Sequence, residues 1–223
     1  MKKILLLSAV MLVAGIVSAQ KVNFGARLRY TDAKLMISAY GMTRHYRDLA
    51  NVDPGVFADI NFGKVTVEPG LLFALKGGAL GGPIIGNSTD YNILNIDLQL
   101  YTLELPVNIL YNIPLKPGKI FIGGGPYAGY AVSGKYKGYT TQYTSPNTVT
   151  EVSTTSTPVS FGSFPTYIKR FDFGLNGLAG FRLNNGFEIN IGMGFGLANV
   201  VNKNNPAVMH NRTISAGIGY FFK

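Results

Sequence analysis

Few side chains of this sequence could form a reactive centre, and no spacing along the chain brings them together. The imidazole bases are His45 and His210, and the Ser residues that either could activate are Ser133, Ser160 and Ser163. Nucleophilic catalysis needs a base within hydrogen-bond reach of the nucleophile and a third group that orients the base. No segment fixes such an arrangement. We therefore predict no catalytic residue and no enzyme activity, with a lipid-modifying hydrolase or acyltransferase as the enzymatic alternative.

Metal and cofactor sites have no better support. The chain has no Cys, which excludes disulfides, Cys-ligated zinc, iron–sulfur clusters and thiol nucleophiles. No Asp-rich segment has the spacing of a calcium-binding loop. The glycine-rich run at residues 192–196 lacks the strand–turn–helix context of a phosphate-binding loop and fits the small-residue face of a strand. We predict no cofactor and no metal. The formal charge of +9 is scattered along the chain, which does not indicate a nucleic-acid partner.

Residues 1–19 have the pattern of a cleaved secretory signal peptide. Lys2 and Lys3 precede an apolar stretch at residues 4–17, which is too short for a comfortable membrane span, and small residues follow at the expected cleavage positions. We expect cleavage at the end of this segment and export from the cytoplasm. The absence of a following Cys argues against a lipid anchor. Residues 20–223 then form one mature domain.

Period-two alternation of apolar and polar residues recurs along the rest of the chain, and it predicts β-strands. A change of parity within one run, near Tyr101 and Thr102, predicts a β-bulge. The runs lie at residues 22–30, 56–62, 65–75, 96–113, 120–132, 171–182, 187–197 and 214–222.

The connections between these runs alternate between short and long. Short turns are expected at residues 63–64, 115–118 and 184–186, the last with an Asn-Gly pair that favours a tight hairpin. The long loops are expected at residues 31–53, 77–95, 133–168 and 199–211. Eight strands with short turns at one end and long loops at the other predict an all-β fold, an eight-stranded antiparallel up-and-down transmembrane β-barrel.

Alternation alone does not say which face points outward, because a soluble barrel buries its apolar face and a membrane barrel turns it toward lipid. Glycines occupy the polar face of the last two runs, where a water-facing strand more usually carries Thr, Lys or Glu. Aromatic residues gather near strand ends, as in the interfacial belts of membrane barrels. They are Tyr30, Tyr130 and Phe171 at one rim, and Phe62, Tyr111, Phe181, Phe187, Tyr220 and Phe222 at the other. We therefore predict that the apolar face contacts lipid.

The opposite parity then predicts a polar lumen filled by charged side chains of both signs. An eight-stranded barrel is just wide enough for its own side chains, and buried charges need partners. Gly217 and Gly219 are expected to leave room for long Arg side chains of the first strand. The inward residues are Arg27, Arg29, Lys76 and Arg182, with Asp59, Glu68, Glu104, Asp172 and Glu188. We predict a packed, closed lumen, and a narrow path for an ion or small solute is the alternative.

Several segments also resemble the PorT-like outer-membrane β-barrel family of small Gram-negative barrel domains. They are Lys-Arg-Phe-Asp-Phe-Gly-Leu at residues 169–175, Leu-Glu-Leu-Pro at 103–106 and Ser-Ala-Gly-Ile-Gly-Tyr-Phe-Phe at 215–222. The Gly/aromatic segments at residues 121–127 and 194–199 sit where that family has its own. The resemblance covers essentially the whole mature chain. It implies a Gram-negative outer-membrane location, and its namesake takes part in a protein-secretion and gliding apparatus.

The sequence therefore predicts a non-enzymatic outer-membrane barrel with a structural or surface-interaction role through its extracellular loops. A component of a secretion or envelope-assembly apparatus is the alternative. Expected partners are outer-membrane lipid, the barrel-assembly machinery during biogenesis and an envelope or secretion-system protein. Basic residues at the outer rim, Lys135, Lys137, Lys169 and Arg170, suggest contact with acidic lipid headgroups.

Overall fold

The computed structural model describes most of the chain after the predicted signal peptide. The described residues are 22–39, 42–44, 47–81, 84–86, 91–144, 148–162, 168–201 and 207–222. The signal-peptide prediction, His45 and Ser163 lie outside them. Within these ranges, no helix is long and apolar enough to cross a bilayer.

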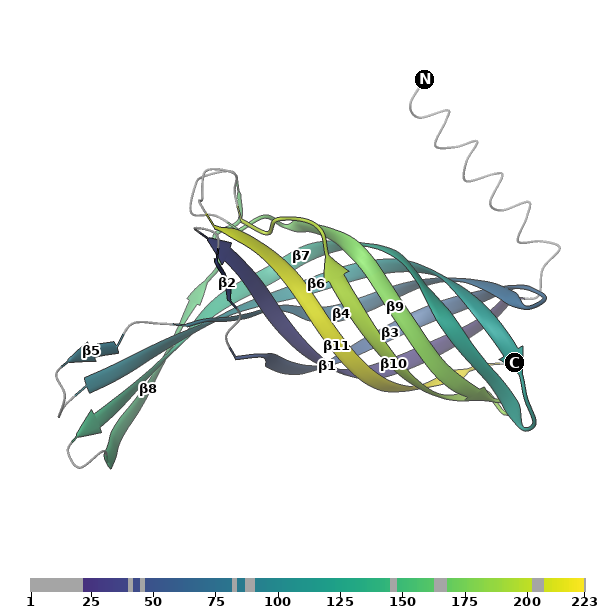
Figure 1. The fold of residues 1–223 in the computed structure, drawn as a ribbon, viewed down its shortest axis with the longest axis horizontal. Helices are drawn as coiled ribbons and strands as arrows, with labels where there is room; N and C mark the ends of the chain where they lie inside the picture. The colour runs from purple at the N-terminus through teal and green to yellow at the C-terminus, as the bar shows by residue number, and fades with distance from the viewer. Residues whose placement is uncertain are drawn as a thin grey trace, which may run out of the picture.

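The described residues form β-strands joined by turns and irregular segments (Figure 1). The strands are β1 (Val22–Ala39), β2 (Met42–Arg44), β3 (Leu49–Phe62), β4 (Val65–Gly81), β5 (Ile84–Gly86), β6 (Tyr91–Pro114), β7 (Gly118–Thr144), β8 (Thr148–Pro158), β9 (Phe171–Leu183), β10 (Phe187–Gly196) and β11 (Val208–Phe221).

Eight of these strands close into an antiparallel ring. β1, β3, β4, β6, β7, β9, β10 and β11 each pair with the next strand along the chain, and β11 pairs with β1. Figure 1 shows the resulting tilted barrel. Closure leaves no strand of the ring with an unpaired edge, which is what a sheet in lipid requires. The predicted eight-stranded up-and-down transmembrane barrel is confirmed.

The three predicted short turns all lie at one end of the barrel, which we call the inner end. In the turn after β3, Gly63 has a φ of 68°, a conformation that side chains other than Gly rarely adopt. Gly186 has a φ of 99° in the Asn-Gly turn between β9 and β10. Leu115 and Gly118 exchange backbone hydrogen bonds of 2.8 and 3.0 Å across the third turn. Each turn therefore joins neighbouring strands directly.

The other end, the outer end, differs from the prediction because four strands extend where long loops were expected. β7 runs on to Thr144 and β8 covers residues 148–158, both inside the predicted loop at 133–168. β6 begins at Tyr91 and β1 continues to Ala39. The extensions are rich in Thr and Tyr, which favour strands. They were missed because their two faces do not alternate between apolar and polar residues.

A projecting sheet, which we call the outer arm, results from these extensions. It consists of β5, residues 91–99 of β6, residues 135–144 of β7, and β8. Figure 1 shows it reaching away from the barrel at the end opposite the C-terminus. Neighbouring strands of the arm pair in the order β5, β6, β7, β8.

The β-bulge predicted near Tyr101 and Thr102 is confirmed. The register between β6 and β7 shifts there, with Tyr101 opposite Ser133 and Thr102 opposite Ala131. Val132 is the extra residue of β7. The bulge reverses the parity of the strand, so that alternation continues on both sides of it.

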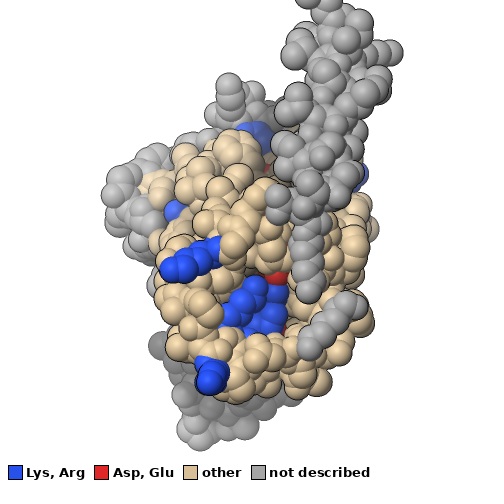
Figure 2. All heavy atoms as spheres, turned by 90° about the vertical axis from the view of Figure 1, so that its right-hand side faces the viewer, with Lys and Arg blue, Asp and Glu red and all other residues tan. Residues whose placement is uncertain are grey.

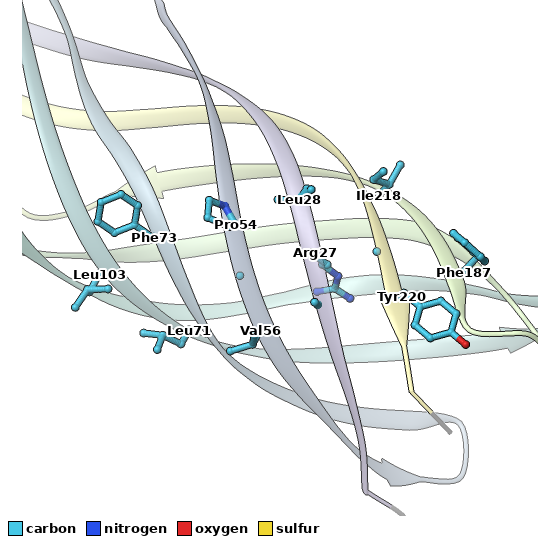
Figure 3. A pocket seen from close by; sticks show the side chains of 13 residues that line it. Arg27, Leu28, Pro54, Val56, Leu71, Phe73, Leu103, Phe187, Ile218 and Tyr220 are labelled. Atoms are coloured by element: carbon cyan, nitrogen blue, oxygen red, sulfur yellow. The ribbon is translucent and has the colours of Figure 1, made fainter.

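Large apolar side chains cover the outer surface of the barrel. Ile191 is 65% exposed and Ile218 is 61% exposed, whereas the neighbouring Asn190 and Gly219 face inward. Figure 3 shows a shallow apolar hollow on this surface, lined by residues from β1, β3, β4, β6, β10 and β11. Exposed apolar side chains on every strand of a closed barrel match a surface in contact with lipid. The predicted facing is confirmed.

Aromatic residues form a belt at each end of this apolar surface. At the outer end, Tyr130 and Phe171 stack edge to face with ring centroids 5.0 Å apart. At the inner end, Tyr220 contacts Phe187 at 5.3 Å and Phe222 at 5.4 Å in the same geometry. Aromatic side chains prefer the water–lipid interface, so the two belts mark where the bilayer begins and ends.

Candidate functional site

The lumen is the densest collection of charged side chains in the described structure, and it divides into an inner and an outer cluster. In the inner cluster, Arg27 of β1 faces Gly219 of β11. A Cβ atom at Gly219 would lie 2.9 Å from Cγ of Arg27. The glycine therefore provides the space for the arginine, as the sequence predicted for Gly217 and Gly219.

Arg27 bridges two carboxylates from strands on either side of it. It donates two hydrogen bonds of 2.6 Å to the carboxylate of Glu68 on β4. Its Nε donates to Glu188 on β10, also at 2.6 Å. All three side chains are almost completely buried. Paired, bidentate contacts of this kind compensate the cost of removing charges from water.

Glu188 also accepts from Arg182 of β9, whose Nε and NH2 lie 2.8 and 2.7 Å from Oε2. Arg182 in turn forms a very short ion pair with Asp59 of β3. Lys119, at the start of β7, lies 3.9 Å from the same aspartate. This chain of ion pairs crosses the barrel and joins β1, β3, β4, β7, β9 and β10. The predicted pairing of Arg27 and Arg182 with Glu68, Asp59 and Glu188 is confirmed.

Aromatic rings fill the space around the two inner guanidinium groups. The Arg27 guanidinium lies 4.4 Å from the ring centre of Phe57, and that of Arg182 lies 3.5 Å from the ring centre of Phe221. Phe121 is fully buried beside both. These cation–π contacts stabilise charges that are shielded from water. The prediction of a polar lumen did not include these rings, although their positions have inward parity in the same runs.

The outer cluster is centred on Lys76 of β4. Its ammonium forms a very short ion pair with Glu104 of β6, and it lies 3.5 Å from Asp172 of β9. Asp172 also accepts hydrogen bonds from the Tyr127 hydroxyl at 3.2 Å and from Asn211 at 3.0 Å. The partner of Glu104 is therefore a lysine, not one of the arginines that the sequence suggested. The lysine is reached because β4 and β6 are neighbours and Lys76 lies opposite Leu100, near Glu104.

Arg29 is the fourth inward cation, and its nearest carboxylate is Asp53 at 3.9 Å. Asp53 is almost fully buried and also accepts hydrogen bonds from Asn51 and from the backbone of Leu75. The sequence placed Asp53 at the end of a long loop. The structure places it within β3, because that strand begins at Leu49.

Little open space is left between the two clusters. The cavity lined by Arg27, Arg29, Lys76 and Glu104 has a volume of about 20 Å³. One water molecule needs about 10 to 15 Å³ when volume is measured in this way. The lumen between the clusters therefore has room for about one water and none for a solute.

An apolar cluster closes the outer end of the lumen. It consists of Leu35, Leu98, Leu100, Val159, Ile168, Val200 and Val201. These residues come from β1, β6 and the segments that follow β8 and β10, and all are buried. The strands alone do not supply such a closure. The outer segments fold back over the barrel mouth, because burying this many apolar side chains is strongly favourable.

Basic side chains lie at the inner end. Lys64 and Lys116 are exposed in the turns, and Lys119 is partly exposed at the start of β7. Figure 2 looks onto this end and shows Lys and Arg side chains gathered near its centre, with acidic surface beside them. The inner mouth is therefore occupied by charged side chains rather than open.

The residues considered for catalysis do not form a reactive arrangement in the described part of the chain. The Nδ1 atom of His210 lies 3.0 Å from the backbone oxygen of Ala198, and Ser133 and Ser160 are exposed. No hydrogen bond between described residues joins His210 to either serine. Residues 192–196 lie in β10, as predicted. Among the described residues, no group of three or more His, Cys, Asp and Glu side chains is arranged to hold a metal ion.

Comparison with solved structures finds other outer-membrane proteins. Ail of Yersinia pestis, solved in complex with the heparin analogue sucrose octasulfate, is 11% identical over 90% of this chain and 99% of its own, with a TM-score of 0.42. Neisserial surface protein A is 15% identical over 91% of this chain and 100% of its own, with a TM-score of 0.39. The outer membrane protease OmpT of Escherichia coli is 10% identical over 90% of this chain and 96% of its own, with a TM-score of 0.29.

No curated protein matches the chain in sequence. A family model described as the outer membrane protein beta-barrel domain matches residues 19–202, which is most of the chain. The match agrees with the closed ring of strands, the apolar outer surface and the two aromatic belts. The chain is an integral protein of the Gram-negative outer membrane and belongs to the outer membrane protein beta-barrel domain family.

Proposed function

We propose that this protein is a non-conducting, non-enzymatic barrel that holds its outer arm at the cell surface as an interaction surface for a protein partner. The observation that carries the proposal is the contrast between the two parts. The lumen is filled, whereas the arm is an ordered sheet that extends beyond the barrel mouth (Figure 1).

The filled lumen argues against transport. A permeating ion would have to break the ion pairs between Arg27, Glu68 and Glu188 at one level and pass the apolar cluster at another. Breaking a buried pair typically costs about 3–5 kcal/mol. The space between the clusters admits about one water, and a second barrier of apolar side chains follows it. Both features favour a plug rather than a pore.

The arm has the properties of a recognition surface. β8 pairs with β7 along one edge, and in the described pairing its other edge has no partner. Residues 153–158 of β8 are exposed and consist of Ser and Thr followed by Pro158. Unpaired strand edges can accept an extended segment of another protein through backbone hydrogen bonds. Exposed hydroxyls and the terminal Pro limit non-specific pairing at the same edge.

Several predictions from the sequence belong to this proposal. They are cleavage of residues 1–19 during export, insertion by the barrel-assembly machinery, and membership of the PorT-like group with an envelope or secretion-system protein as partner. The segments at residues 103–106, 169–175 and 215–222 support the PorT-like resemblance. All of them lie on barrel strands or at their ends.

The conductance of the purified barrel tests the closed lumen. We expect no sustained single-channel current in planar bilayers from protein that shows the heat-dependent gel mobility of a folded barrel. Steady current from such protein would refute the non-conducting part of the proposal.

A shortened arm tests the interaction surface. Gly138 and Thr155 are paired across β7 and β8, so an Asn-Gly turn can replace residues 139–154 and keep the remaining hairpin. In cells, a cleavable crosslinker should capture a surface partner with the wild-type protein and not with the shortened variant, provided that both fold. Capture of the same partner by both would contradict a role for the arm.

The same strains separate the alternatives. Loss of protein secretion in a deletion strain, restored equally by the wild-type and shortened proteins, would favour a secretion-apparatus component that acts without the arm. A change in the acyl chains of lipid A or phospholipids in the deletion strain would favour a lipid-modifying enzyme.

A further inference from the structure

A set of outward-facing basic side chains lies just beyond the outer aromatic belt. We call it the outer basic rim and define it as Lys34 of β1, Lys135 of β7, Arg170 immediately before β9, and Arg212 of β11. Lys34 is flanked by the buried, inward residues Ala33 and Leu35, so its own side chain points outward. Arg212 is two residues from the lipid-facing Ile214 on the same strand face.

Three of these cations lie over aromatic rings. The Lys135 ammonium is 5.6 Å from the ring centre of Tyr101. The Arg170 guanidinium lies 4.1 Å from the ring centre of Phe161 and 5.7 Å from that of Tyr130. Each cation is thus held on the outer side of a ring that belongs to or borders the belt.

The Arg212 guanidinium lies 5.3 Å from the ring centre of Phe195 and donates to the backbone oxygens of Gly196 and Asn211 at 2.7 and 3.2 Å. Arg170 is fixed in the same manner by the backbone oxygens of Ala131 and Val132 at 2.8 and 3.3 Å. The two guanidinium groups are therefore positioned before any ligand arrives, which lowers the entropic cost of binding.

The rim lacks the anions that would neutralise it. Within the described residues, no ion pair joins any of its four cations to a carboxylate. Lys34 lies directly opposite Arg212 in the register of β1 and β11, and like charges in this position destabilise a sheet. Asp32 is on the same outward face, two residues from Lys34, and offsets part of this charge.

Two neighbouring lysines named in the sequence analysis are already engaged. Lys169 donates to the backbone oxygen of Asn199 at 3.1 Å. Lys137 lies opposite Asp97, whose carboxylate also accepts two hydrogen bonds from Arg47 at 2.7 and 2.8 Å. The rim as defined therefore excludes both of them.

From this geometry we infer that the outer basic rim binds the phosphate groups of a phosphorylated glycolipid in the outer leaflet. Aromatic belts sit at the level of the headgroups, so cations immediately beyond the belt are at the level of lipid phosphates. A phosphate between Lys34 and Arg212 would also relieve their mutual repulsion. Guanidinium groups bind phosphate oxygens with directional, charge-assisted hydrogen bonds.

A charge-removal pair tests the site. The outer double variant is Lys34→Gln with Lys135→Gln, because neither side chain forms a hydrogen bond or ion pair among the described contacts that would be lost on folding. The matched control is Lys64→Gln with Lys116→Gln, which removes the same charge from exposed turns at the inner end. Binding of bis-phosphorylated lipid A to the folded, detergent-purified proteins is measured by native mass spectrometry.

Each basic residue near an anionic lipid surface contributes about fivefold in affinity. We therefore expect the outer double variant to bind lipid A up to about thirtyfold more weakly, and the control to bind as the wild-type protein does. Lys34→Arg with Lys135→Arg should restore binding, which separates lost charge from a folding defect. Dephosphorylated lipid A should bind weakly to all variants.

Three results would overturn the inference. They are unchanged binding by the outer double variant, an equal loss in the control, and equal binding of the dephosphorylated lipid. Equal binding of phosphatidylglycerol at matched charge would show general attraction to anionic lipid, and would overturn the assignment to a glycolipid of the outer leaflet.

Discussion

Replacing Glu188 by Gln tests whether the lumen network stabilises the barrel. Glu188 accepts charge-assisted hydrogen bonds from Arg27 at 2.6 Å and from Arg182 at 2.8 Å, and it is almost completely buried. Gln keeps the shape of the side chain and one acceptor oxygen, but it removes the negative charge and places an amide donor against a guanidinium. The inner cluster then contains more positive charge than its carboxylates can balance.

The expected magnitude follows from these contacts. Removing one partner of a buried ion pair typically costs about 3–5 kcal/mol. Arg27 retains Glu68 and Arg182 retains Asp59, which places the loss near the lower end of that range, at about 3 kcal/mol. Because the chain has no Trp, unfolding by guanidinium chloride in lipid vesicles is best followed by circular dichroism and by the mobility of the folded gel band. Ile189→Val, on the lipid face of the same strand, is the matched control and should unfold nearly as the wild type.

A double-mutant cycle with Arg182→Gln assigns the loss to the pair. We expect the double variant to be less destabilised than the sum of the two single variants, because each single change leaves a charge without its partner. Additive losses, or a Glu188→Gln protein as stable as the wild type, would refute the idea that the network is dry and tightly coupled. The lumen would then have to be hydrated enough to screen its charges.

The remaining predictions concern facing, space and the outer cluster. Ile191→Arg should abolish most insertion, since a charge at the bilayer midplane of the lipid face costs about 2–4 kcal/mol, whereas Asn190→Arg should insert better because it faces the lumen; equal yields of folded protein in vesicles would contradict the facing. Gly219→Val should lower the unfolding midpoint through overpacking by about 1–3 kcal/mol, and Ala216→Val on the lipid face of the same strand should not. Glu104→Gln should destabilise the barrel less than Glu188→Gln, because the lysine it leaves still has a second carboxylate within 3.5 Å; a larger loss measured by the same unfolding assay would contradict this ranking.

The parts of the fold that could be predicted are those where one physical signal dominates. In the barrel wall, lipid on one side and a packed lumen on the other impose strict alternation, so facing and even the bulge at Tyr101 follow from parity. The match between Arg27 and Gly219 could also be anticipated, because a ring of eight strands places its first and last strands side by side. These predictions need only the pattern and the rule of closure.

The outer arm could not be predicted in the same way, because both of its faces meet water. Residues 135–144 and 148–158 are stabilised by pairing with their neighbours, and pairing leaves no periodic trace in a polar sequence. The partners within the lumen were equally hidden. Parity places Glu104 inside, but whether it meets an arginine or Lys76 depends on strand tilt and stagger. The site residue Asp53 was missed because the start of β3 has no apolar alternation.

The distribution of filled and exposed surfaces narrows where this protein acts. The inner charged cluster, the cavity with room for about one water and the apolar cluster over the outer mouth form successive barriers along the barrel axis. Chemistry inside the barrel would have to disrupt at least one of them. The outer rim is different, because there the cations face outward, lack carboxylate partners among the described residues, and adjoin an ordered sheet with an open edge. Binding at the cell surface therefore requires no rearrangement of the lumen, and the rigid plug instead keeps the surface that binds in a fixed position.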